Sequence, residues 1–456
     1  MTRLYAIIIA IFSAAACAMA LPADHFAAHS VLAEGRWVKV AVPSSGLYCI
    51  TPAQLRAWGF DNIDAVRVYG YGGRRVPDRL DAASCVDDLP LVQTARTTKG
   101  IVFYGAGPDE LTPQGNCFTV SSSPYTTAGY YFVGVTDAPE REIAIIGVGE
   151  ADNPSESFTE VLHHELDAIS PGEAGPLLVG EEFRLTPRRT FAFDAPDRVD
   201  GANLWLQCGF VAVTPSAPSY VDFAVNGETL PRVDTDRIST MSTSSYQHAM
   251  MTVTQHTFSI SAAQRLQVEV RHSSPSSVVY NAWLDYLTLC YERRLALPQS
   301  GRLEFRSYSS RLRLDGGAAD GLEVWDVTDP LDIKRMRTGR SGSAAVWTND
   351  YTGLRHYAAF TPSAAIPSPE FVKVVSNTDL HATPAATDMV IFTPALLRTA
   401  AERIAAFHRA EPDTLQVAVV NVEDLYNEFG SGSADVSAMR KYLKMLYDRG
   451  TAVGRP

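Results

Sequence analysis

Two histidines and a glutamate, His163-His164-Glu165, form the first place in the sequence where metal chemistry could occur. A zinc-binding helix of the His-Glu-x-x-His kind needs two imidazoles one turn apart on the same face. Ala168 stands where the second imidazole would have to be. We therefore interpret the run as part of a polar surface helix and expect no metal there.

Two other sets of side chains have suitable chemistry for a metal but unsuitable spacing. His248 and His256 lie eight residues apart in a region of strands and turns, with no carboxylate at a matching offset. Carboxylates on a loop suit calcium, and four aspartates are close in sequence: Asp78, Asp81, Asp87 and Asp88. These aspartates lack the alternating ligands and closing glutamate of a calcium loop. We assign neither set to a metal or a cofactor.

Two glycine-containing motifs resemble catalytic or binding signatures only in part. Gly70-Tyr71-Gly72-Gly73 follows a strand, but no helix follows to present its N-terminus to a phosphate. Gly339-Arg340-Ser341-Gly342 resembles a nucleophile elbow, yet Ser343 stands where the second glycine is needed. We predict neither a dinucleotide site nor a serine triad.

Five cysteines follow residue 20, widely spaced and without a Cys-x-x-Cys pair: Cys49, Cys85, Cys117, Cys208 and Cys290. This spacing argues against a zinc ribbon or a dense disulfide framework. An oxidising compartment would allow one or two disulfides, and the odd number leaves at least one thiol unpaired. All five lie in β-rich stretches, where buried structural cysteines are expected more often than a reactive thiolate. No catalytic residue is assigned.

The first twenty residues are typical of a signal peptide. Arg3 supplies the positive charge, residues 6–16 form an apolar stretch, and Ala18-Met19-Ala20 is a small-x-small cleavage site. A lipoprotein site at Cys17 is the weaker alternative, because Ala14 stands where a bulky aliphatic residue is expected. No later stretch has the roughly 18 apolar residues of a spanning helix. We expect an exported protein.

Composition narrows the class of protein further. The 456 residues are 46% hydrophobic and 20% charged, which is ordinary for a folded protein with several domains. The formal net charge of −12 repels phosphate backbones and argues against nucleic acid as a partner.

Strand signals fill most of the chain. Residues 36–42 alternate, and Thr51 followed by Pro52 predicts the start of a short helix. Strands return from residue 191 to residue 375, where Asn226-Gly227 is a strong hairpin signal. Many short strands at this spacing indicate sandwich- or barrel-like domains. Between these regions, residues 155–169 are polar and are predicted to form one helix.

The last seventy residues change their period. Two continuous apolar runs, residues 389–392 and 417–420, predict strands buried on both faces. A helix after Thr393-Pro394 would place Leu396, Ala400, Ile404 and Phe407 inward, and a helix from Asp435 would do so with Val436, Met439, Leu443 and Leu446. Strand, helix, strand, helix is a βαβ unit with parallel strands. Two strands cannot cover two helices, so we expect the domain to be incomplete within this sequence.

The residues of this segment resemble the opening of a gingipain-like cysteine peptidase domain. The resemblance rests on residues 388–394, 401–408 and 422–432, continuing into 435–447. Upstream, residues 31–40, 67–73, 180–183, 282–287 and 324–330 resemble the N-terminal part of PorU-type sortases of the type IX secretion system. The likeness covers most of the chain after residue 20.

This resemblance implies a transpeptidase at the cell surface with a caspase-like domain. Such enzymes cleave the C-terminal sorting domain from exported cargo and attach the cargo to anionic lipopolysaccharide, with outer-membrane secretion proteins as partners. It also implies that the catalytic histidine and cysteine come after residue 456, so the chain alone is expected to be inactive. The alternative is an exported β-sandwich binding or adhesion protein.

The expected domain organisation follows from the pattern and the resemblance together. It comprises a signal peptide (1–20), an N-terminal β-rich domain (21–170), a second β-rich domain (171–385) and an incomplete gingipain-like α/β peptidase domain (386–456).

Overall fold

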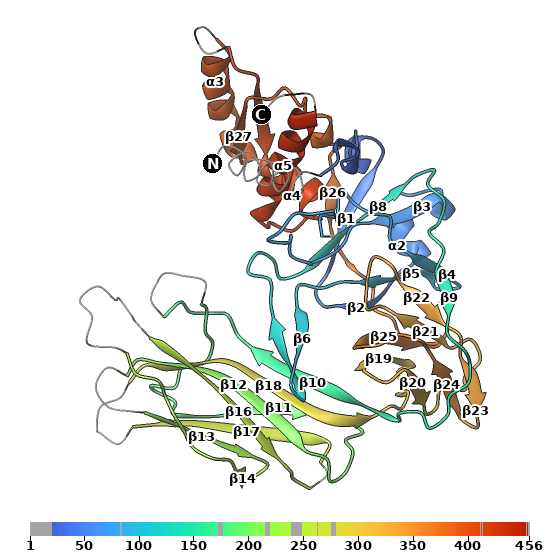
Figure 1. Cartoon of the computed structure of the whole chain (residues 1–456), viewed down its shortest axis with the longest axis vertical. Helices are drawn as coiled ribbons and strands as arrows, with labels where there is room; N and C mark the ends of the chain where they lie inside the picture. The colour runs from blue at the N-terminus through green and yellow to red at the C-terminus, as the bar shows by residue number, and fades with distance from the viewer. Residues whose placement is uncertain are drawn as a thin grey trace, which may run out of the picture.

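The computed structural model describes residues 21–82, 84–171, 177–214, 219–238, 249–261, 263–274, 280–410, 412, 414–452 and 454. In these residues strands predominate and form three β units, here called the β body, followed by an α/β segment from residue 380 onwards (Figure 1). This arrangement confirms the predicted fold class, mainly β sheets followed by the opening elements of an α/β domain. The predicted signal peptide and Cys17 lie outside the described residues.

The first β unit is built from two small sheets. One has the order β26 (Glu370–Val375), β1 (Trp37–Val42), β8 (Gly129–Val135), β3 (Val66–Tyr69), and the other the order β2 (Gly46–Ile50), β5 (Gly100–Gly105), β4 (Thr94–Thr97). Short helices accompany them: α2 (Pro52–Ala57), η1 (Ala23–His25), η2 (Val31–Ala33) and η3 (Ile63–Ala65). Alternation along β1 places Val38 and Val40 in the core between the sheets, while Trp37 packs on Tyr69 on the other side.

Local rules account for the start of helix α2. The Thr51 side chain accepts a hydrogen bond from the Gln54 backbone N–H, and the Gln54 side chain accepts one from the Thr51 backbone N–H. Pro52 occupies the first turn, where its missing N–H costs nothing. The predicted helix start is confirmed.

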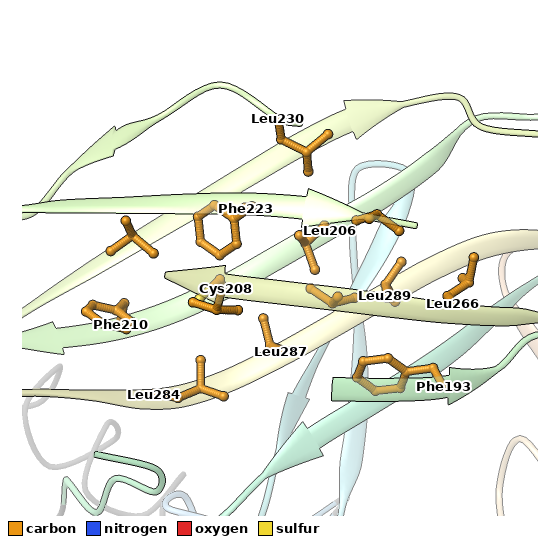
Figure 2. Packing of buried hydrophobic residues seen from close by; sticks show 14 of the residues in the cluster. Phe193, Leu206, Cys208, Phe210, Phe223, Leu230, Leu266, Leu284, Leu287 and Leu289 are labelled. Atoms are coloured by element: carbon orange, nitrogen blue, oxygen red, sulfur yellow. The ribbon is translucent and has the colours of Figure 1, made fainter. Parts of the chain in front are cut away.

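The second β unit is a sandwich of two antiparallel sheets (Figures 1 and 2). One sheet has the order β10 (Ser157–Glu165), β18 (Ala282–Arg294), β12 (Leu204–Ala212), β16 (Met250–Phe258), and the other the order β11 (Arg188–Asp194), β17 (Arg265–Ser273), β13 (Tyr220–Val225), β14 (Glu228–Thr229), with β15 (Val233–Asp234) also paired to β13. Leu206, Phe210 and Leu289 from one sheet meet Phe223 and Leu266 from the other in a buried core. Burial of this apolar surface is what holds the two sheets together.

A turn of the predicted kind links β13 to β14. Asn226 and Gly227 adopt φ angles of 49° and 88°, the left-handed conformation that such a two-residue hairpin requires. The Asn226 side chain also accepts a hydrogen bond from the backbone N–H of Gln267 at 2.7 Å. The hairpin prediction is confirmed.

The third β unit again has two sheets. They are β19 (Arg302–Ser307), β25 (Arg355–Phe360), β21 (Glu323–Asp326), β22 (Lys334–Met336), β9 (Ala144–Ile146), and β20 (Arg311–Leu314), β24 (Ala344–Thr348), β23 (Gly339–Ser341). A hairpin of β6 (Glu110–Gln114) and β7 (Cys117–Ser121) extends from the first unit to the sandwich (Figure 1). A disulfide between Cys117 and Cys290 fastens this hairpin to strand β18.

The helix predicted for residues 155–169 is wrong. This stretch forms strand β10, paired antiparallel with β18 from Ser157 opposite Arg294 to Glu165 opposite Tyr286. Phe158, Thr159 and Val161 are residue types that favour strands. The pairing partner lies more than a hundred residues away in the sequence, so the local polar composition was a poor guide.

The α/β segment contains the predicted βαβ unit. Strands β27 (Met389–Thr393) and β28 (Val417–Asn421) are parallel, and the helices are η4 (Leu380–Ala382), η5 (Ala395–Leu397), α3 (Arg398–Arg409), α4 (Val422–Phe429) and α5 (Ser437–Ala452). Most residues of the two strands are only half-buried, so the expectation of burial on both faces is wrong. In the described part of the chain no helix combines the length and the apolar character needed to cross a membrane.

The predicted inward faces of the two long helices are also wrong. Leu396, Ile404 and Phe407 are exposed, whereas Ala401 and Ala405 are buried in α3. In α5 the buried face carries Ala438, Lys441, Tyr442, Met445 and Leu446, so only Leu446 of the predicted stripe is fully buried. Helix α5 packs on helix α4 and on strands β27 and β28. Leu21, Phe26 and Cys85 of the first β unit cover the rest of this face.

Strand pairing crosses the expected domain limits. Strand β10 precedes residue 170 but pairs with β18, strand β9 pairs with β22, and strand β26 returns from the third unit to pair with β1. The limits at residues 170 and 385 stay predictions.

Candidate functional site at the junction of the first β unit and the α/β segment

The histidine run predicted for a helix lies on strand β10. Neighbouring strand residues point to opposite faces of a sheet, so His163 and His164 cannot hold one ion together. His163 contacts Thr288 Oγ1 at 2.8 Å and Glu165 Oε2 at 3.1 Å, while His164 contacts Glu181 Oε1 at 2.8 Å. Among the described residues no cluster of three or more metal-binding side chains occurs.

The remaining metal candidates are separated by the fold. His256 is buried on β16 against Phe223, and burial lowers the pKa of its imidazole. His248 lies outside the described residues. Among the aspartates, Asp81 contacts Ser84, Asp88 accepts hydrogen bonds from Ser30 and Val31, and Asp87 binds a histidine considered below.

The two glycine motifs have structural roles. The turn after β3 places Gly72 at φ 71°, where an added Cβ would lie 2.3 Å from the carbonyl oxygen of Ala106. Gly339 and Ser341 belong to strand β23, which pairs with β24 and does not lead into a helix. Neither motif has the strand-to-helix setting that its catalytic reading requires.

Three cysteines of the described residues are free thiols, and all three are buried: Cys49, Cys85 and Cys208. Burial raises the pKa of each thiol. A reactive cysteine needs the opposite, a lowered pKa in a partly open setting. The free thiols therefore have the environment of structural cysteines.

Several buried charged residues of the described chain lie where the α/β segment meets the first β unit, here called the junction. Gly430 follows helix α4, and Ser431 and Gly432 adopt left-handed φ angles of 49° and 86°, which turn the chain toward α5. Asp435 accepts a hydrogen bond from the Ser437 backbone N–H at 2.8 Å near the start of α5. This short turn brings polar groups of α4 and α5 against the loop after strand β3.

His381 lies at the centre of the junction, completely buried between two carboxylates. Its Nδ1 contacts Glu428 Oε2 at 2.8 Å and its Nε2 contacts Asp87 Oδ1 at 3.1 Å. The ring stacks on Phe429 with centroids 4.5 Å apart and an angle of 6° between the planes. Burial opposes the charge, but the hydrogen bonds with Asp87 and Glu428 raise the pKa of His381 to about 9. At neutral pH it is an imidazolium that donates both protons, and it is not a general base.

Further hydrogen bonds fix the turn between α4 and α5 on the β body. Ser431 Oγ accepts from the Tyr71 backbone N–H at 2.9 Å and donates to the Tyr130 carbonyl at 3.1 Å. Asp435 Oδ2 accepts from the Val76 backbone N–H at 2.9 Å. Each contact joins residues more than 300 positions apart in the sequence.

A buried lysine completes this surface from the β side. Lys39 on strand β1 donates to the Gly432 carbonyl at 2.7 Å and to Asn427 Oδ1 at 3.2 Å, and its ammonium lies 4.2 Å from the centre of the Tyr130 ring. Burial lowers the pKa of Lys39 to about 8, and the charge of Lys373 acts in the same direction. Sequence reasoning missed the whole junction, although the Gly430-Ser431-Gly432 turn was among the residues that carried the family resemblance.

Comparisons with known proteins agree on one family. The family model described as Peptidase family C25 matches residues 382–456, the α/β segment. The crystal structure of dimeric latent PorU from Porphyromonas gingivalis superimposes with a TM-score of 0.85 at 25% sequence identity, covering 94% of this chain and 41% of that one. This chain therefore spans about two fifths of the PorU chain. A search of curated proteins finds no match.

Other solved structures resemble the chain far less. The match to the insecticidal delta-endotoxin Cry8Ea1 from Bacillus thuringiensis covers 49% of this chain and 52% of that one. Its sequence identity is 10% and its TM-score is 0.20, too low to indicate a shared fold. The family match and the PorU superposition agree with the resemblance read from the sequence. Residues 382–456 of the chain are similar to Peptidase family C25, and its fold over 94% of its length is similar to that of PorU.

Proposed function

We propose that the chain is the N-terminal part of an exported cysteine endopeptidase and transpeptidase. Its substrates would be exported proteins that carry a C-terminal sorting domain, which it removes before passing the new carboxyl end to anionic lipopolysaccharide. The single observation that carries the proposal is the PorU superposition, which extends over 94% of this chain. The enzyme would act between the periplasm and the outer-membrane surface, beside secretion partners.

The proposal assigns the chemistry to residues outside these 456. A cysteine peptidase needs a thiolate activated by a histidine and backbone N–H groups that bind the oxyanion. The three free thiols of the described chain are buried with raised pKa values, and His381 is held protonated by two carboxylates. These environments support a structural role for the thiols and for this histidine.

The β body would then serve as a platform for the peptidase domain. The junction supports this role, because Lys39, His381, Ser431 and Asp435 fix α4 and α5 on the first β unit through buried contacts. Buried polar contacts of this kind define one orientation rather than a sliding interface. The opening elements of the peptidase domain would thereby be held at a fixed angle to the body.

Disruption of the gene in the source bacterium tests this function. Exported proteins with a C-terminal sorting domain should then keep that domain, and mass spectrometry of their C-terminal peptides should show the uncleaved form. Complementation with the intact gene should restore cleavage and the attached lipopolysaccharide. Normal processing in the disrupted strain would contradict the proposal and favour a binding or adhesion protein.

A further inference from the structure

We propose that a small cavity between the loop of residues 74–86 and helix α5 binds one carboxylate group, held by Lys441, Arg74 and Arg75. The site lies beside the junction and is independent of the peptidase chemistry proposed above.

The lining of this cavity has a strong excess of positive charge. Its volume is about 50 Å³, which exceeds the roughly 10–15 Å³ that one water needs and is enough for a group of carboxylate size. Three basic side chains line it, together with Tyr71, Ser84, Cys85 and apolar residues. No carboxylate of the described chain belongs to its wall.

Lys441 has hydrogen-bonding capacity that the described protein does not use. Lys441 is buried, with 2% of its surface exposed, and its ammonium group has three N–H donors. Its hydrogen bond within the described chain is a long one, 3.4 Å to the Phe429 carbonyl, and the rings of Tyr71 and Phe429 lie 5.4 and 5.7 Å away. Burying a charge is costly unless it is paired.

The nearby acidic side chains are engaged elsewhere. Asp87 binds His381 and the Ala27 backbone N–H, and Asp88 binds Ser30 and the Val31 backbone N–H. Neither carboxylate forms an ion pair with Lys441 within the described chain. An anion in the cavity would supply the missing partner for the ammonium.

The other buried lysine of this region shows what a satisfied ammonium looks like. Lys39, 7% exposed, donates to two oxygens at 2.7 and 3.2 Å and has an aromatic face 4.2 Å away. It lines neither this cavity nor the larger one beside it. Lys441, unlike Lys39, therefore lies at a cavity that two further basic residues line.

A carboxylate can reach the site from a larger cavity of about 520 Å³, which shares residues 74–77 of the wall. Both arginines are exposed; Arg74 lies 3.5 Å from Asp329, while Arg75 forms no ion pair within the described residues. A free small carboxylate and the terminal carboxylate of a peptide lying in the larger cavity share this chemistry.

Calorimetric titration of residues 21–456 with sodium acetate, with a tripeptide bearing a free carboxylate and with its carboxamide tests the proposal. Lys441→Met should raise the Kd for the carboxylate ligands about tenfold or more, as expected for loss of a charged hydrogen bond. Arg75→Gln, at an exposed position, should leave the fold intact and weaken binding in the same direction. Arg184→Gln, at an exposed position before strand β11 that lines neither cavity, is the control and should leave the Kd unchanged.

Each outcome decides the matter. If the tripeptide binds more tightly than acetate and its carboxamide does not bind, the ligand is a peptide terminus. If acetate binds as tightly as the tripeptide, the ligand is a free small anion. Failure of acetate and tripeptide to bind in the millimolar range, or equal Kd values for the unaltered chain, Lys441→Met and Arg75→Gln, would overturn the proposal. If Lys441→Met does not fold, the comparison of Arg75→Gln with Arg184→Gln decides.

Discussion

At the scale of single residues, the charge of His381 depends on the two carboxylates that flank its ring. Because its pKa rises from the ordinary 6.5 to about 9 on folding, the folded chain binds this proton more tightly than the unfolded chain does. The resulting stabilisation is fully present below pH 6.5 and is lost as the pH rises through 9. Histidine is usually a sensor for mildly acidic pH, and here the neighbours move its transition to the alkaline side.

The first prediction concerns this pH dependence. The free energy of unfolding should fall by about 3 kcal/mol between pH 6.5 and pH 9.5 through His381, since one pKa unit corresponds to about 1.4 kcal/mol. His381→Gln should lower stability at pH 6.5 and flatten this part of the profile. Urea unfolding followed by tryptophan fluorescence measures both effects.

His29→Gln is the control for that experiment. His29 contacts Asp379 at 2.7 Å but its side chain is 71% exposed, so the exposed pair should contribute only about 0.2–1 kcal/mol. If His381→Gln still loses about 3 kcal/mol of unfolding free energy between pH 6.5 and pH 9.5, the buried imidazolium is not the source of that loss.

The second prediction separates close packing from backbone strain at two glycines with similar positive φ. Gly342→Ala, at φ 63° with nothing within 4 Å of the added Cβ, should cost about 1–2 kcal/mol. Gly72→Ala, at φ 71°, should cost about 1–3 kcal/mol more, because its Cβ would lie 2.3 Å from the Ala106 carbonyl oxygen. Equal losses of unfolding free energy, measured by urea unfolding, would mean that the loop after β3 shifts to accommodate the added methyl group without cost.

At the scale of elements, the β6–β7 hairpin depends on a covalent link to another unit. The Cys117–Cys290 disulfide joins residues 173 positions apart. Closing so long a loop strongly reduces the conformational entropy of the unfolded chain. Reduction should therefore lower the free energy of unfolding by about 2–5 kcal/mol. The chain with Cys117→Ala and Cys290→Ala should have this lower stability already and should not respond to reductant. A further loss on reduction of that variant would contradict the assignment.

Local signals were enough to predict some elements from the sequence. Thr51 with Pro52 and Asn226 with Gly227 specify a helix start and a hairpin through their own backbone preferences. The parallel pairing of β27 with β28 followed from two apolar runs on either side of a helix. These features depend on residues that are close in the sequence.

The failures have a common physical cause. Strand β10 was predicted as a helix, and its partner, β18, is distant in the sequence. The buried face of α5 is covered by several elements, including α4 and distant residues of the first β unit. The junction depends on pairs such as Asp87 with His381 and Lys39 with Gly432, separated by 294 and 393 positions. Which cysteines pair was likewise beyond sequence reasoning, since connectivity follows from the tertiary arrangement.

At the scale of the whole molecule, the α/β segment lies at one end and the sandwich at the other (Figure 1). The first β unit contacts both, because the junction joins it to α4 and α5 and the β6–β7 hairpin runs from it to the sandwich. Its loop after β3 contributes to the junction and to both cavities. The first unit is therefore the element that joins the α/β segment to the rest of the β body.

We propose, above all, that the thiols of the described chain are structural and that the proposed peptidase chemistry does not use them. The direct measurement is turnover of a set of peptide substrates by residues 21–456 under reducing conditions. We predict no thiol-dependent turnover, because Cys49, Cys85 and Cys208 are buried with raised pKa values. Turnover that disappears when one of these cysteines is changed to alanine would contradict the account.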